Sequence, residues 1–196
     1  MSFLEILLQV GTVFLGAFLA FGLENFRERR QLRAWANDYL GRVREDLLED
    51  GEDTRTIKDL EETVTDYATF TALDKDHVPN EDEWNSLMKL FAVTHSNYHA
   101  LLESTAVRVL PAELVKALAE LDEHRREDEI MTDLCSTAWQ QYTVPLVLQQ
   151  TPITDVERRG LEYTQGFFKL RLESVRKRLE TEKRVLELLD RHNLGR

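Results

Sequence analysis

Residues 6–23 read ILLQVGTVFLGAFLAFGL and are followed at once by ENFRERR at residues 24–30. Between Glu5 and Glu24 no side chain is charged, and only Gln9 and Thr12 are polar. Such a run rises about 27 Å as a helix, close to the roughly 30 Å hydrocarbon core of a bilayer. We therefore expect a transmembrane anchor in residues 1–25 and a helical domain in residues 26–196.

Two other interpretations of this run are weaker. A cleaved signal peptide needs a basic segment before the apolar run and two small residues separated by one at the cleavage site. Here Glu5 is the only charged side chain before the run, and Ala17 and Ala20 are separated by two residues. A buried helix of a soluble core normally has a polar face, whereas this run is apolar all round. The membrane span is the better interpretation.

The charges beside the run predict its orientation. Arg27, Arg29, Arg30 and Arg33 follow it within ten residues, and no Lys or Arg precedes it. Because basic residues close to a span resist translocation, we expect a bacterial inner-membrane protein with its N-terminus outside and its C-terminal domain in the cytoplasm. The same arginines are candidates for holding the anionic headgroups of membrane lipids.

One face of the predicted span carries small residues. Thr12, Gly16 and Ala20 recur every four residues. Small side chains in one row let a second helix approach closely in a membrane, so these residues predict a helix-packing face. The alternative is ordinary composition, because Gly and Ala are common in membrane helices.

Composition limits the function of the remainder. The chain has 36 acidic and 25 basic residues and a net charge of −11, which argues against a nucleic-acid-binding protein. The single cysteine, Cys135, excludes an internal disulfide framework and agrees with a reducing compartment. Eight Gly and four Pro are few, and this scarcity of turn-forming residues is typical of a helical protein.

The spacing of apolar residues predicts an all-α fold, a bundle of about four to five helices with long antiparallel arms. No segment shows the alternation of a strand. The predicted helices cover residues 24–47, 57–71, 80–91, 96–102, 111–145 and 154–192. Residues 49–53 are expected to form a kink or a short break, residues 74–79 a loop and residues 151–155 a turn. In residues 57–71 the apolar side chains form the seam of a coiled-coil-like helix.

Local signals mark several of these helices. Asn80 with Glu83 resembles a capping pair, and Pro111 suits the first turn of a helix. The nearly continuous charges of residues 122–129 predict a solvated stretch. The side chains expected to be buried are Trp84, Leu87, Leu90, Phe91, Leu114, Leu118, Leu121, Ile130, Leu134, Trp139, Val175, Leu179, Val185 or Leu186, and Leu189.

Two segments resemble a bacterial family of single-span, N-terminally anchored helical proteins. Residues 16–30 resemble the family's anchor, which ends in Gly, an apolar residue, an acidic residue, Asn and an aromatic residue; Gly22-Leu23-Glu24-Asn25-Phe26 matches this ending. Residues 98–106 resemble a second segment, although Thr105-Ala106 stands where relatives have Gly. The family carries no known activity, so the resemblance implies an anchored helical domain and no catalytic role.

Candidate sites in the sequence are few. His95, His99 and Glu103 lie four residues apart, a spacing that can place metal ligands on one helical face. A metal would need a further ligand such as His77 or His124, and surface or packing histidines are the more common role. Cys135 lies among apolar residues and is expected to be buried. Trp139, Tyr142, Phe167 and Phe168 are candidates for lining a pocket, although aromatic residues at helical spacing usually form core.

We therefore expect a protein that is not an enzyme and that binds no cofactor and no metal. The predicted function is an accessory or scaffold subunit of a larger membrane complex, whose partners are membrane lipids and other transmembrane subunits. Respiratory or photosynthetic assemblies are possible partner complexes by analogy only. The alternative is a self-associating signalling or sensor protein that relays a change through the helix leaving the membrane.

Overall fold

The structure is a computed structural model that describes residues 3–49, 51–87, 99–147, 149 and 151–195. The side chains of residues 3–10, 49, 51–54, 99 and 100 lie outside the described part. Predictions that concern these side chains, or Leu90, Phe91, His95 and Tyr98, therefore fall outside it.

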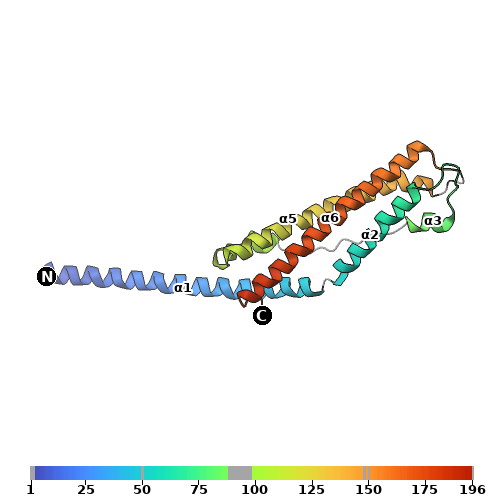
Figure 1. Cartoon of the computed structure of the whole chain (residues 1–196). Helices are drawn as coiled ribbons and strands as arrows, with labels where there is room; N and C mark the ends of the chain where they lie inside the picture. The colour runs from blue at the N-terminus through green and yellow to red at the C-terminus, as the bar shows by residue number, and fades with distance from the viewer. Residues whose placement is uncertain (1–2, 50, 88–98, 148, 150, 196) are drawn as a thin grey trace.

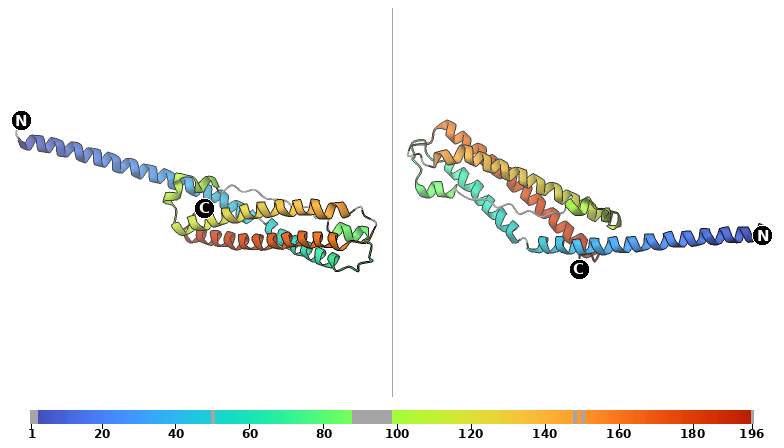
Figure 2. Two further views of the ribbon diagram at one scale, coloured as in Figure 1. Left: turned by 90° about the horizontal axis from the view of Figure 1, so that it is seen from above. Right: turned by 180° about the vertical axis from the view of Figure 1, so that it is seen from behind.

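The described residues are helical and include no strand, which confirms the all-α prediction. The long helices are α1 (Phe3–Glu49), α2 (Gly51–Thr71), α5 (Ala112–Ala138) and α6 (Asp155–Arg191). Shorter elements are α3 (Glu81–Ser86), α4 (His99–Leu102), η1 (Thr105–Val109), the π-helical turn η2 (Trp139–Thr143) and η3 (Val144–Leu146). α6 packs against α5 along one side and against α2 along another, and the N-terminal half of α1 projects away from this bundle (Figures 1 and 2).

Helix ends follow the sequence signals. The Asn80 side chain accepts a hydrogen bond from the Glu83 backbone N–H, and the Glu83 carboxylate accepts one from the Asn80 N–H. Thr154 and Glu157 form the same reciprocal cap at the start of α6. α5 begins after Pro111, and the predicted break near residues 74–79 is a loop. These caps satisfy backbone donors that the first turn of a helix leaves unpaired.

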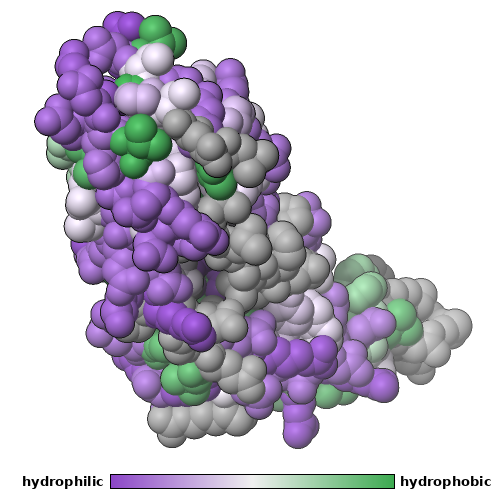
Figure 3. Space-filling view, turned by 90° about the vertical axis from the view of Figure 1, so that its right-hand side faces the viewer, coloured by the Kyte–Doolittle hydropathy of each residue, from purple (hydrophilic) through white to green (hydrophobic). Residues whose placement is uncertain are grey.

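The buried apolar side chains form two separate clusters. The first lies where α1, α4, α5 and the end of α6 meet, and includes Leu40, Leu118 and Leu189. The second lies among α2, α3, α6 and the end of α5, and includes Tyr67, Trp84 and Phe168. Among the described residues, those on the surface at this second end of the bundle are mostly hydrophilic, with scattered apolar ones (Figure 3).

A layer of buried charges separates the two clusters. Asp128 on α5 is 3% exposed and accepts hydrogen bonds from Arg171 Nε at 3.2 Å and Arg178 Nη1 at 2.9 Å. Arg125 Nη2 donates to Glu182 Oε1 at 3.3 Å in the same layer. The prediction of a solvated stretch at residues 122–129 is therefore wrong for Arg125 and Asp128, although Asp122 and Glu129 are not buried.

The same layer explains why the predicted burial is wrong for Ile130 and Leu134 on α5 and for Leu179 on α6. The buried side of α5 continues from Leu121 through Arg125, Asp128 and Thr132 to Cys135. Because these residues follow three- and four-residue steps, Ile130 and Leu134 fall on the other side and are exposed, contrary to the prediction. On α6, Arg178 and Glu182 are buried and Leu179 is only half-buried. Leu114, Leu118, Leu121, Val175, Val185 and Leu189 are buried as predicted.

Candidate functional site

α1 consists of two parts with opposite environments. From Ala36 onward one side of the helix is buried, and Leu40 is fully covered. From residue 11 to residue 35 the described side chains are exposed or half-buried, including Phe18, which is 78% exposed. The exposed large apolar side chains of this part are Val13, Phe14, Leu15, Phe18, Leu19, Phe21, Leu23, Phe26 and Trp35.

The predicted span of residues 6–23 begins among residues 6–10, whose side chains lie outside the described part. Within the side chains that are described, no helix has a stretch long and apolar enough to cross a membrane. α1 passes the predicted domain boundary at residue 25 without interruption.

The predicted packing row lies on the outside of the molecule. Thr12, Gly16 and Ala20 are all exposed. No atom from elsewhere in the described part of the chain comes within 4 Å of where a Cβ would stand on Gly16. This face of α1 is therefore accessible to another molecule, and its role in helix packing stays a prediction.

The four predicted arginines take different positions around α1. Arg27, Arg29, Arg30 and Arg33 are all exposed. Arg29 and Arg33 are four residues apart and Arg30 and Arg33 three apart, so these three share the side of α1 that continues into Asn37 and Leu40. Arg33 lines a pocket.

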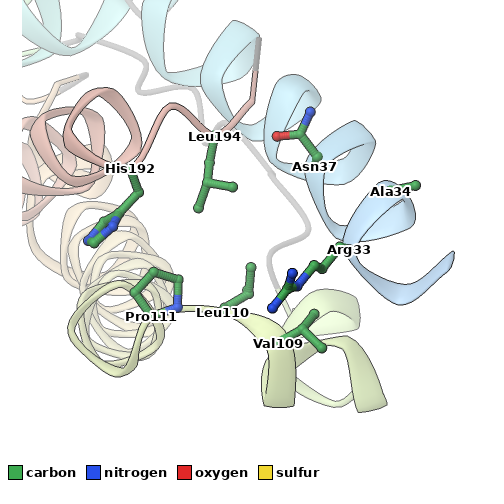
Figure 4. A pocket seen from close by; sticks show the side chains of 8 residues that line it. All are labelled: Arg33, Ala34, Asn37, Val109, Leu110, Pro111, His192 and Leu194. Carbon is green, nitrogen blue, oxygen red and sulfur yellow. The ribbon is translucent and has the colours of Figure 1, made fainter. Parts of the chain in front are cut away.

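This pocket, which we call the junction pocket, has a volume of about 390 Å³. Three segments that are distant in sequence form its walls: α1, the connection from η1 to α5, and the end of α6 (Figure 4). Its lining residues are Arg33, Ala34, Asn37, Val109, Leu110, Pro111, His192 and Leu194. The sequence singled out Arg33 for orientation and Pro111 for a helix start, and it missed the other lining residues.

The wall from α6 is held by a tight helix end. Asn193 has φ 52°, and the Leu194 N–H donates to the Leu189 carbonyl at 2.9 Å. The Asn193 N–H donates to the Asp190 carbonyl at 3.2 Å. This is the Schellman arrangement, in which a left-handed residue turns the chain back and satisfies the last carbonyls of the helix. The turn places Leu194 in the first apolar cluster.

The segment after α6 is fixed to α1. The Gly195 N–H donates to Asn37 Oδ1 at 2.7 Å, and Arg44 Nη1 donates to the Leu194 carbonyl at 3.2 Å. Gly195 has φ 69°, and a Cβ there would lie 2.8 Å from the Leu40 carbonyl oxygen. Only glycine fits this conformation and this close approach without strain. Two walls of the junction pocket are therefore held together by direct bonds.

The Glu113 carboxylate at the start of α5 contacts two side chains at the end of α6, beside the pocket. His192 Nε2 lies 2.7 Å from Glu113 Oε1, and Arg191 Nη1 lies 3.4 Å from Glu113 Oε2. Glu113 belongs to the first turn of α5, where a negative charge also interacts favourably with the helix dipole. Pro111, the N-cap of α5, supplies no side-chain hydrogen bond to that turn.

The metal hypothesis mostly concerns side chains outside the described part. His95 and the imidazole of His99 lie there, and Glu103 is exposed. His77 Nε2 contacts the Glu83 carboxylate at 2.9 Å, and the His124 imidazole lies 3.3 Å from Glu127. Among the residues that are described, no three His, Cys, Asp or Glu side chains are grouped so as to hold a metal ion.

Cys135 and the aromatic residues have packing roles. Cys135 is buried in the second cluster, and burial raises the pKa of its thiol to about 12. Burial likewise raises the pKa of the Tyr67 phenol, whose oxygen shares a 2.8 Å hydrogen bond with Thr143 Oγ1. Phe168 packs on Tyr67, with 5.5 Å between the ring centroids, and Trp139 Nε1 donates to the Leu87 carbonyl at 2.9 Å. A thiol held in its neutral form is a poor nucleophile.

Comparison with protein-family models, with curated proteins and with solved structures found no match to this chain.

Proposed function

We propose that this protein is a non-catalytic accessory subunit of a larger bacterial membrane complex, anchored by a single span at its N-terminus. The observation that carries the proposal is the first part of α1, whose apolar side chains no described part of the chain covers. Burying one large apolar side chain is worth about 1.5–3 kcal/mol. A continuous exposed surface of this kind is typical of a segment that lipid or another protein covers.

The charge pattern supports an orientation. Arg27, Arg29, Arg30 and Arg33 follow the apolar run, while the chain as a whole has a net charge of −11. Retention of these arginines on the cytoplasmic side places the helical domain in the cytoplasm. The domain then braces the cytoplasmic side of the complex while the span packs against its transmembrane helices.

The row of Thr12, Gly16 and Ala20 supports packing against a partner helix. These residues lie on one face of α1, and Phe14 and Phe18 lie on the opposite face. The first test is alkaline carbonate extraction of bacterial membranes, in which the full-length protein should stay in the membrane fraction. Recovery in the soluble fraction would overturn the anchor.

The second test is extraction in mild detergent followed by sizing and mass spectrometry of the chains that co-purify. Other membrane subunits should accompany the wild-type protein. The double variant Gly16→Leu with Ala20→Leu should lose them, because larger side chains hold the two helix backbones apart. The matched control, Phe14→Leu with Phe18→Leu, should keep them. A single monodisperse chain without companions contradicts the accessory role.

A second candidate is a self-associating signalling protein. The observation that favours it is the continuity of α1, one helix from Phe3 to Glu49 that joins the predicted span to the first apolar cluster. A displacement of the span would reach that cluster directly. The same extraction separates the two candidates, because here the co-purifying chains are only further copies of the protein.

A further inference from the structure

We propose that the junction pocket binds the phosphate headgroup of an anionic phospholipid from the leaflet that surrounds the span. This inference rests on the proposed anchor and adds a specific ligand site to it. The pocket is lined by Arg33, Ala34 and Asn37 of α1. In this part of α1 the projecting helix meets the bundle, and the end of the chain lies against it (Figures 1 and 2). It is therefore on the side of the domain nearest the proposed membrane.

The height of the pocket above the membrane suits this ligand. Phe26 is an exposed aromatic residue directly after the apolar run, the kind of residue found at membrane interfaces. Arg33 lies ten residues beyond Leu23, the last residue of the apolar run, which is a rise of about 15 Å along a helix. The headgroup layer extends roughly 5–8 Å beyond the hydrocarbon core. The Arg33 backbone therefore lies beyond this layer, and its long side chain extends back toward the layer, because helical side chains point toward the N-terminus of their helix.

The lining combines one cation with apolar walls. Arg33 supplies a guanidinium that takes part in no hydrogen bond or ion pair within the described part of the chain. Such a group binds phosphate oxygens through two parallel N–H donors. Arg29 and Arg30 lie one turn closer to the membrane on the same side of α1. The His192 imidazole is also in the wall, and it contacts the carboxylate of Glu113.

The apolar part of the lining favours a lipid over a free anion. Five of the eight lining residues are apolar, and in Figure 4 the side chains of Val109, Leu110 and Leu194 lie around the cavity. These side chains suit the glycerol and the first acyl carbons next to a lipid phosphate. A volume of about 390 Å³ falls within the roughly 300–1,000 Å³ of small-ligand sites.

The experiment uses the full-length protein in nanodiscs of phosphatidylcholine with or without phosphatidylglycerol, and native mass spectrometry measures the retained lipid. Wild type should retain phosphatidylglycerol in preference to phosphatidylcholine. Arg33→Gln should weaken this retention about tenfold, because a charge-assisted phosphate contact is lost. Arg27→Gln, on the same helix but outside the pocket, should change retention by less than threefold.

A second variant tests the cavity without changing any charge. Val109→Trp fills the pocket from the end of η1, where the Val109 side chain points toward Arg33 (Figure 4), and should reduce retention as strongly as Arg33→Gln. Retention that falls equally in Arg27→Gln and Arg33→Gln and is unchanged in Val109→Trp would overturn the proposal, since it would indicate only a diffuse attraction to the arginines. Displacement of the lipid by millimolar glycerol 3-phosphate or inorganic phosphate would also overturn it in favour of a soluble phosphate ligand.

The proposed anchor can fail independently of this inference. If the protein leaves the membrane on carbonate extraction, the anchor is wrong. If it stays in the membrane and the pocket variants retain lipid like the wild type, only the lipid site is wrong.

Discussion

Replacing Asp128 by Asn should strongly destabilise the bundle, because this carboxylate holds two buried guanidinium groups. Arg171 Nε and Arg178 Nη1 both donate to it, and the side chains of Arg171, Arg178 and Asp128 are 1%, 6% and 5% exposed. Asn keeps the shape of the side chain but removes its charge. The arginines then remain buried without this negative partner.

The size of the effect follows from the burial. Removing one partner of a buried ion pair costs about 3–5 kcal/mol. For a domain of this size, each kcal/mol lowers the melting temperature by about 2–4 °C, so Asp128→Asn should lower it by roughly 6–20 °C. The matched control is Asp38→Asn on α1, whose carboxylate pairs with Arg42 at 2.8 Å, both side chains being about 70% exposed. Such i,i+4 pairs are worth about 0.3–0.5 kcal/mol, a shift of about 2 °C or less.

The assay is thermal unfolding of the full-length protein in detergent, monitored by far-UV circular dichroism. Combining Asp128→Asn with Arg171→Met should cost less than the sum of the two single changes, since the second removes a charge that the first leaves unpaired. Equal shifts for Asp128→Asn and Asp38→Asn would refute the argument that the charged layer is desolvated and structurally important.

Three further predictions concern single residues. Gly166→Ala on α6 should raise the free energy of unfolding by about 0.5–1 kcal/mol, because no neighbour in the described part of the chain lies within 4 Å of the new Cβ. Gly160→Ala should lower it by about 1–2 kcal/mol, because its Cβ would lie 2.8–3.2 Å from Tyr142 side-chain atoms. The same melting assay measures both changes, and equal effects would contradict the packing of Tyr142. Gly195→Ala should release the end of the chain from α1, seen as faster digestion by carboxypeptidase, while Gly166→Ala should leave that rate unchanged. Cys135 should react with a maleimide at pH 8 at least tenfold more slowly in the folded protein than in denaturant, since burial raises the pKa of its thiol to about 12; equal rates would show that the thiol is accessible.

The helices were predictable because their signals are local. The pair of Asn80 and Glu83 starts α3, and the loop after α2 lies where the apolar spacing stops. The π-helical turn at residues 139–143 was not predicted. It accommodates Pro145 through a change in hydrogen bonding before the proline, so the chain leaves α5 over several residues and does not stop at one.

The charged layer was not predictable from α5 alone. Arg125 and Asp128 look like ordinary surface residues until α6 supplies Arg178 and Glu182 opposite them. The sequence separation between these partners exceeds 40 residues, so no local spacing reveals the pairing. The periodicity did contain a signal, since Leu121, Asp128 and Cys135 lie seven residues apart on one side of the helix.

The junction pocket depends even more on tertiary contacts. Its walls come from residues near 33, 110 and 193, which only the folded bundle brings together. A weak sequence signal existed in Asn193 and Gly195, because residues that adopt positive φ after a long helix indicate a turn back toward the body of the protein. What the turn contacts could not be inferred without the position of α1.

The charged layer also bears on the proposed function. A continuous apolar seam between α5 and α6 would tolerate sliding by one turn, because leucine side chains fit one another in several registers. Asp128 accepts from Arg171 and Arg178, which lie about two turns apart on α6, so a slide by one turn would break both hydrogen bonds and leave buried charges unpaired. The two helices are thus fixed in one register. α1 joins them through the first apolar cluster and through the bonds of Asn37 and Arg44 to the end of the chain. A domain held this firmly suits a brace that sets the position of neighbouring subunits better than a relay that must change its packing.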